Sequence, residues 1–133
     1  MNNQSKIKYA LNELIKGSPF NDIGEIFSKD YLSHVGEKQY RGHAIIKKWS
    51  KELNSTFSNL KVSNLIFFTE TEDTVVWQRT LKGKHTKSIR GILASGKIIQ
   101  WNEIIISKFV EGKIEEEWIV SELLGKLLLK VPK

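Results

Sequence analysis

The chain has 133 residues, no cysteine and a formal charge of +6, from 21 lysines and arginines against 15 acidic residues. This length fits one domain over residues 1–133, which can bury a core without a metal or disulfide staple. The lack of cysteine excludes thiol nucleophiles, disulfides and thiolate-bound metals. No apolar run reaches the roughly 18 residues of a membrane span, and the first residues lack the apolar segment of a signal peptide. We expect a cytoplasmic protein that does not bind membranes.

The positive charge comes mostly from lysine, because only Arg41, Arg79 and Arg90 are arginines. Arginine makes most of the bidentate contacts that proteins form with phosphates and bases. A lysine-rich excess is typical of a solvated surface. We therefore expect no nucleic-acid partner.

Apolar residues at helical spacing predict three helices in the first half of the chain. The first covers residues 7–15. The second starts near Ser18, has its apolar face within residues 23–31 and is followed by a loop over residues 33–38. The third covers residues 42–57 and has the clearest period.

From residue 60 the apolar period changes to two, which predicts strands. Glycine and acidic residues at turn positions separate them. The expected strands cover residues 60–70, 74–81, 85–92, 97–109 and 113–120. A short terminal turn or helix follows Ser121. Helices followed by an antiparallel meander predict an α+β fold, in which the helices cover one face of the sheet.

Strong catalytic and cofactor motifs are missing from the sequence, which has no phosphate-binding loop, dinucleotide fingerprint, HExxH or GxSxG. His34, His43 and His85 stand far apart and lack the spacing of metal ligands. We expect neither a metal nor a cofactor. The remaining candidate functions are acid–base chemistry inside a pocket and ligand binding there.

The long strand over residues 97–109 carries a glutamate among apolar residues. Alternation places these residues on one face: Ile99, Trp101, Glu103, Ile105 and Ser107. Burial there would raise the pKa of Glu103, which suits a general acid or base. The alternative is an ion pair with a nearby lysine or arginine.

Arg79 shares a strand face with Val75, Trp77 and Leu81. It can hold an anionic ligand or form a structural ion pair, for which Glu103 is a candidate partner. Four tryptophans supply mass for a core or an interface, and a pocket would use one or two of them. They are Trp49, Trp77, Trp101 and Trp118.

The last strand contains three consecutive glutamates, most of which we expect to be solvated. Alternation places Glu115 and Glu117 on the face of Ile119, and Glu116 on the face of Ile114 and Trp118.

Five short segments, spread over nearly the whole chain, carry recognisable motifs. They are residues 30–34 (DYLSH), 81–86 (LKGKHT), 91–97 (GILASGK), 108–118 (KFVEGKIEEEW) and 122–125 (ELLG). Together these segments resemble the motifs of SnoaL-like polyketide cyclases, a branch of the nuclear transport factor 2-like superfold. Each segment is a weak signal alone, and their order and spacing make the resemblance fairly specific for the fold.

This resemblance implies a cone, in which a strongly curved antiparallel sheet wraps around three N-terminal helices and encloses a deep apolar pocket. It also implies dimers through the outer sheet face. The family's cyclases close a ring by an aldol step without metal or cofactor, using an Asp after the Trp of the last strand and a His on the long strand. The matching positions here are Ile119 and Ile105, which cannot move a proton. The resemblance therefore implies an apolar ligand pocket more than the ring closure itself.

Two functions follow for the pocket. The first is small-molecule binding without cyclisation. The second is a cofactor-independent ester cyclase, isomerase or hydratase, with Glu103 or Glu117 as the base and Tyr31, His34 or Arg79 polarising a carbonyl oxygen. The pocket residues expected for either function are Tyr31, His34, Trp49, Trp77, Arg79, Trp101, Ile105 and Ile119. A third hypothesis makes the outer sheet face, with Trp118, an interaction surface that a second copy of the chain covers.

Overall fold

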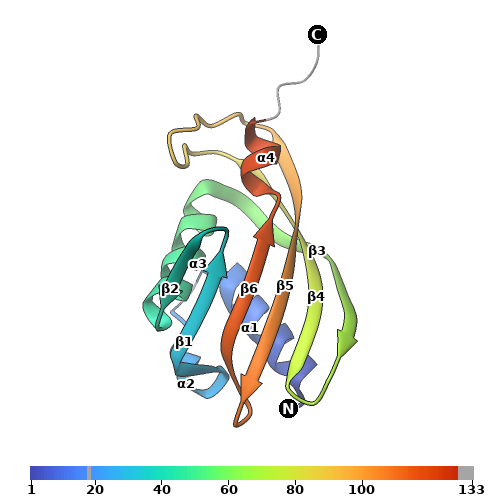
Figure 1. Ribbon diagram of the computed structural model, residues 1–133. Coiled ribbons are helices and arrows are strands. Elements are labelled where there is room, and N and C mark those ends of the chain that lie inside the picture. Colours follow the sequence, from blue (N-terminus) through green and yellow to red (C-terminus); the bar gives the residue numbers. More distant parts are fainter. Residues whose placement is uncertain (18, 129–133) are drawn as a thin grey trace.

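The computed structural model describes residues 1–17 and 19–128, and Figure 1 shows a curved sheet with α1 and α3 on one of its faces. The described strands form one sheet in the order β2-β1-β6-β5-β4-β3. The elements are α1 (Asn3–Lys16), α2 (Ile23–Ile26), β1 (Phe27–Val35), β2 (Lys38–Arg41), α3 (His43–Thr56), β3 (Phe57–Glu70), β4 (Thr74–His85), β5 (Ile98–Val110), β6 (Lys113–Ser121) and α4 (Leu123–Leu128). The predicted α+β cone is confirmed.

One pair of neighbouring strands departs from the expected antiparallel sheet. β1 and β6 are parallel, whereas every other pair in the described sheet is antiparallel. The chain between them runs through α3 and the β3–β4–β5 meander, and such a long connection allows neighbouring strands to run in the same direction. The pairing places Ser33 opposite Glu117.

The second predicted helix is wrong beyond its first turn. α2 is a single turn, residues 27–35 form β1, and the predicted loop over residues 33–38 contains the end of β1, the turn of the β1–β2 hairpin and the start of β2 instead. Phe27 and Tyr31 lie four residues apart, which fits a helix as well as a strand. Residues 27–35 form a strand because β2 and β6 supply hydrogen-bond partners on both edges of β1. Ser18, the predicted start of this helix, lies outside the described residues.

The predicted strand over residues 85–92 is also wrong. β4 continues to His85, and the chain then enters a connection over residues 86–97 that contains a tight turn closed by an isolated bridge. The central residues of this turn, Arg90 and Gly91, have φ of 48° and 81°. Left-handed backbone of this kind ends a strand, and an alternating apolar pattern does not reveal it.

The other predicted helices and strands are confirmed in type. α1 and α3 match the first and third predicted helices, β3 to β6 match the four remaining predicted strands, and α4 follows Ser121. β3 begins three residues earlier than expected, directly where α3 ends. None of the described helices has the length and apolarity that a membrane crossing requires.

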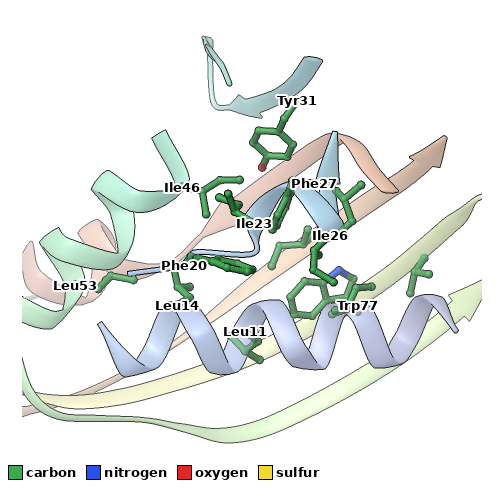
Figure 2. Packing of buried hydrophobic residues seen from close by; sticks show 14 of the residues in the cluster. Leu11, Leu14, Phe20, Ile23, Ile26, Phe27, Tyr31, Ile46, Leu53 and Trp77 are labelled. Atoms are coloured by element: carbon green, nitrogen blue, oxygen red, sulfur yellow. The ribbon is translucent and has the colours of Figure 1, made fainter. Parts of the chain in front are cut away.

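The hydrophobic core lies between the helices and the inner face of the sheet (Figure 2). Ile7, Leu11 and Leu14 form the buried stripe of α1, at the spacing that one helix face requires. The sheet contributes Trp77 and Trp101, which are 3% and 1% exposed. Full burial of a large apolar side chain stabilises a fold by about 1.5–3 kcal/mol. These contacts hold α1 against the sheet and leave little free volume between them.

β6 contains an irregularity that places Ile114 on the same inner face as Glu117. Between two successive pairs with β5, β6 carries one extra residue, Glu115. Such a β-bulge shifts the alternation of the strand by one residue. Ile114 and Glu117 are therefore both buried. The expectation that Ile114 shares a face with Glu116 and Trp118 is wrong for this reason.

Gly83 of β4 marks a close approach between two strands. A Cβ added to Gly83 would lie 2.8 Å from the Phe57 Cβ. Because Phe57 is buried, we expect Gly83→Ala to lower the free energy of unfolding by about 1–3 kcal/mol, measured by urea denaturation. Gly125→Ala is the control, since an added Cβ there meets no atom within 4 Å. Equal stability of Gly83→Ala and the wild-type chain would contradict this packing.

Candidate functional site

A cavity of about 50 Å³ lies between α1, α3 and the inner face of the sheet. Most of its wall is aliphatic or aromatic, with residues such as Ile7 of α1 and Ile46 of α3. Three polar side chains also line it: Tyr31 from β1, Arg79 from β4 and Glu117 from β6. A water molecule needs about 10–15 Å³ and a drug-sized ligand about 300–1,000 Å³. In this state the cavity therefore has room for a few waters or a very small ligand.

The carboxyl group of Glu117 accepts a hydrogen bond on each oxygen. Tyr31 Oη donates to Oε1 at 2.7 Å. Ser107 Oγ donates to Oε2. Ser107 Oγ in turn accepts a hydrogen bond from Trp77 Nε1 at 2.9 Å, which holds the serine in place. Glu117, only 7% exposed, is thus a buried carboxyl group held by hydroxyl groups from the two strands that flank β6.

Burial raises the pKa of Glu117 above its ordinary value, because a carboxylate loses its hydration in the interior. The hydrogen bonds from Ser107 and Tyr31 and the positive charge of Arg79 lower this pKa, but they do not offset burial. Burial and the charge of Glu117 raise the pKa of Tyr31 well above its usual value, so the phenol keeps its hydrogen. A carboxyl group with a raised pKa at an apolar cavity can serve as an acid or a base.

The second buried glutamate, Glu103, is part of an ion pair. Arg79 Nη2 and Nε lie 2.7 and 2.8 Å from Glu103 Oε1. Ser121 Oγ and Trp101 Nε1 donate to Oε2 at 2.6 and 3.2 Å. Burial by itself raises the pKa of Glu103, but Arg79 and these hydrogen bonds outweigh burial and lower the pKa. Glu103 therefore stays ionised, whereas Glu117 keeps a proton to higher pH. Glu103 is suited to hold Arg79, and Glu117 is suited to exchange a proton.

The structure brings most of the predicted site residues together. Those that line the cavity are Tyr31, Trp49, Trp77, Arg79, Ile105, Glu117 and Ile119. Ile105 and Ile119 pair across β5 and β6. Glu103 contacts the site through Arg79. Trp101 packs in the core beside Phe57, with ring centroids 4.8 Å apart.

His34 lies away from the cavity, on the outer face of the sheet. Its ring stacks on Trp118 with centroids 5.0 Å apart, and its Nε2 is 2.7 Å from Glu116 Oε2. Tyr31 and Ser33 are the inward residues of β1 at this point, so alternation turns His34 outward. In the part of the chain that the structure describes, no three His, Asp or Glu side chains come together to hold a metal ion.

Two serines lie beside Glu117, and the sequence predicted no role for either of them. Ser107 was expected on the same strand face as Glu103 and Ile105, and alternation alone could have drawn attention to it as a candidate site residue. Ser33 carried no such signal, because its segment was predicted as a loop. Both serines are fully buried.

Several solved structures share this fold. TsrD from Streptomyces laurentii is 22% identical, and the match covers 94% of this chain and 93% of that chain with a TM-score of 0.76. AclR from Streptomyces galilaeus is also 22% identical, with 98% and 85% covered and a TM-score of 0.75. An NTF2-like protein from Anabaena variabilis ATCC 29413 is 15% identical, with 89% and 84% covered and a TM-score of 0.68. At such identities the likeness shows the fold alone.

The sequence itself matches a family. None of the curated protein sequences matches this chain. The family model described as SnoaL-like polyketide cyclase matches residues 6–128, a range that includes every residue lining the cavity. The resemblance stated from the sequence motifs is thereby confirmed: this chain belongs to the SnoaL-like polyketide cyclase family.

Proposed function

We propose that this chain binds a small carbonyl compound in the cavity and that Glu117 transfers a proton on that compound without a cofactor. The observation that carries the proposal is the carboxyl group of Glu117, buried at an apolar cavity with a raised pKa. Tyr31 and Ser107 hold this group in one orientation. Membership of a family of small-molecule-binding cyclases supports the same reading.

The proposed chemistry needs one base and one donor. A hydrogen on the carbon next to a carbonyl is acidic, because the negative charge left behind moves onto the oxygen. Ionised Glu117 takes that proton, and protonated Glu117 returns it to another atom, which describes an isomerase or a cyclase. Arg79 lines the same cavity and can donate to the oxygen as its charge develops.

Two isoleucines of the cavity wall favour binding without chemistry as a second candidate function. Ile105 and Ile119 line the cavity at the positions where the sequence resemblance expects the ring-closing His and Asp. Aliphatic side chains exchange no proton. If Glu117 is also inactive, the cavity would only hold its ligand.

For the outer face of the sheet, we propose a second copy of the chain as the partner. Apolar side chains are exposed there, with Ile104 at 43%, Ile106 at 36%, Trp118 at 38% and Val120 at 70%. Ile104 pairs with Val120 and Ile106 with Trp118, so the apolar patch is continuous across β5 and β6. Continuous exposed patches of this kind mark interaction surfaces, and a twofold axis would place the patch against itself.

We also propose a single domain over residues 1–133 and a cytoplasmic location. The lysine-rich charge of +6 supports a solvated surface with no nucleic-acid or membrane partner.

Exchange of carbon-bound hydrogen for deuterium reports the proposed proton transfer. A panel of small ketones and esters in D₂O is followed by NMR with and without the protein. Glu117→Gln keeps the size of the side chain but cannot take a proton, so we expect protein-dependent exchange to slow by about 100-fold or more. Glu115→Gln, at the bulge of the same strand, is the matched control and should retain the rate.

Thermal stabilisation by the same panel separates binding from chemistry. A compound that stabilises the chain without exchanging its hydrogen would favour binding alone. Exchange that is equally fast in Glu117→Gln would contradict the role of Glu117, and a panel with no stabilising compound would contradict the ligand class.

The pH dependence should follow the ionisation of Glu117. Exchange should rise with pH and level off, with a midpoint above the roughly 4.3 of an exposed glutamate, because burial raises this pKa. The native state binds the proton more tightly than the unfolded chain. The stability of the wild type should therefore fall relative to Glu117→Gln as pH rises through this pKa. Urea denaturation at several pH values measures the difference, and a difference that is constant with pH would contradict the burial argument.

A lysine in the outer patch should separate the proposed dimer. Ile104→Lys would place two like charges near the twofold axis, so we expect it to sediment as a monomer while the wild type sediments as a dimer. Leu93→Lys is the control, because Leu93 is 82% exposed in the connection over residues 86–97, outside the patch. A monomeric wild type, or a dimeric Ile104→Lys, would argue against this interface.

A further inference from the structure

The hydroxyl group of Ser33 is buried without a hydrogen-bond partner in the described chain. The residue is 0% exposed. A buried polar group in this condition costs free energy and needs an explanation. Ser33 follows Tyr31 by two residues on β1 and stands in register with Glu117 on β6. Its unpaired hydroxyl group therefore belongs to the surroundings of the proposed acid/base.

Ser107 determines the hydrogen positions at one oxygen of Glu117. The indole nitrogen of Trp77 can only donate, and it donates to Ser107 Oγ at 2.9 Å. The hydrogen of Ser107 is then directed at Glu117 Oε2. An oxygen that already accepts this hydrogen is the poorer place for the proton of the carboxyl group. The proton of Glu117 consequently belongs on Oε1, the oxygen that faces Tyr31.

A proton on Oε1 displaces the hydrogen of Tyr31, because two hydrogens do not fit between oxygens 2.7 Å apart. Tyr31 Oη reaches Glu117, and Glu117 stands in register with Ser33, so the buried hydroxyl groups of Tyr31 and Ser33 lie on the same inner face beside this carboxyl group. The Ser33 hydroxyl group also lowers the pKa of Tyr31, which burial and Glu117 raise. We propose that Ser33 Oγ accepts the hydrogen of Tyr31 whenever Glu117 is protonated, so that Tyr31 and Ser33 form a two-hydroxyl relay for this proton.

Ser33 Oγ makes no hydrogen bond to the described residues in the observed arrangement, so the relay requires the Ser33 side chain to turn toward Tyr31 Oη when Glu117 takes up its proton. When Glu117 is ionised, Tyr31 donates to Oε1, as the structure shows. When Glu117 is protonated, Oε1 donates to Tyr31 Oη and Tyr31 donates to Ser33 Oγ, because a hydroxyl group can both donate and accept. Ser33 does not line the cavity. It is a positioning residue that acts on Glu117 through Tyr31.

The other groups that face Glu117 offer no substitute for this acceptor. The cavity-lining side chains of α1 and α3 are apolar or aromatic. Arg79 of β4 has only donors, and it is bonded to Glu103 of β5. Ser107 of β5 is already occupied by Trp77 and Glu117. The acceptor that remains for Tyr31 lies on its own strand.

The inference rests on the proposed role of Glu117, but its test needs no substrate. ¹³C NMR of the glutamate carboxyl carbons during a pH titration gives the pKa of Glu117, whose signal is identified by its loss in Glu117→Gln. Ser33→Thr keeps a hydroxyl group. Ser33→Val has nearly the same shape as Ser33→Thr but has no hydroxyl group. Ser33→Ala removes the hydroxyl group without adding volume, so it gives an answer even if the larger side chains disturb the fold.

Loss of the acceptor disfavours protonated Glu117. We therefore expect Ser33→Val and Ser33→Ala to lower the pKa of Glu117 by about 0.5–1 pH unit, the size of one hydrogen bond, and Ser33→Thr to keep the wild-type value. Equal values in Ser33→Thr and Ser33→Val, or a raised value in Ser33→Ala, would overturn the relay. Since the titration needs no substrate, a failed deuterium-exchange assay leaves its result intact, and a failed relay leaves that assay intact.

Discussion

The burial of the Glu117 carboxyl group away from water is the constraint on which the arrangement of the other site residues depends. β6 is paired on both edges, with β1 and β5, and α1 and α3 cover the inner face of the sheet. Glu117 stands opposite Ser107 of β5, on the inner face that it shares with Ile119. Burial then raises the pKa of Glu117, and the hydroxyl groups of Tyr31 and Ser107 reduce the cost by replacing part of its hydration. Without these hydrogen bonds, a buried carboxyl group would strongly destabilise the fold.

The same interior holds a second carboxyl group, that of Glu103, whose pKa is lowered instead of raised. Arg79 neutralises Glu103, and Ser121 and Trp101 satisfy its other oxygen. Pairs of this kind add little net stability, but removal of one partner leaves an uncompensated buried charge. The pair therefore holds the guanidinium group at the cavity wall in one position. Two glutamates on neighbouring strands thus differ in their chemistry because one has a cation in contact and the other has hydroxyl groups.

Strand alternation places different sets of side chains on the two faces of the sheet. The inner face of β5 and β6 carries the cavity wall, including Ile105 and Ile119, and the outer face carries the exposed apolar patch with Trp118. Tyr31 and His34 show the same division within one strand, since the first contacts Glu117 and the second stacks on Trp118. The proposed ligand binding and the proposed self-association can therefore change independently, because their residues point in opposite directions.

The sequence by itself determined the fold class, the helices α1 and α3, the long strands and the common face of β5 on which Glu103 and Ile105 lie. These segments are long enough for the apolar period to identify one type of structure. The tertiary structure decided β1, β2, the bulge at Glu115 and the outward turn of His34. β1 takes its form from hydrogen bonds with β6, far along the chain, and a bulge exists only relative to the partner strand. The difference between Glu103 and Glu117 likewise follows from which groups other strands bring to them, and no spacing rule contains that information.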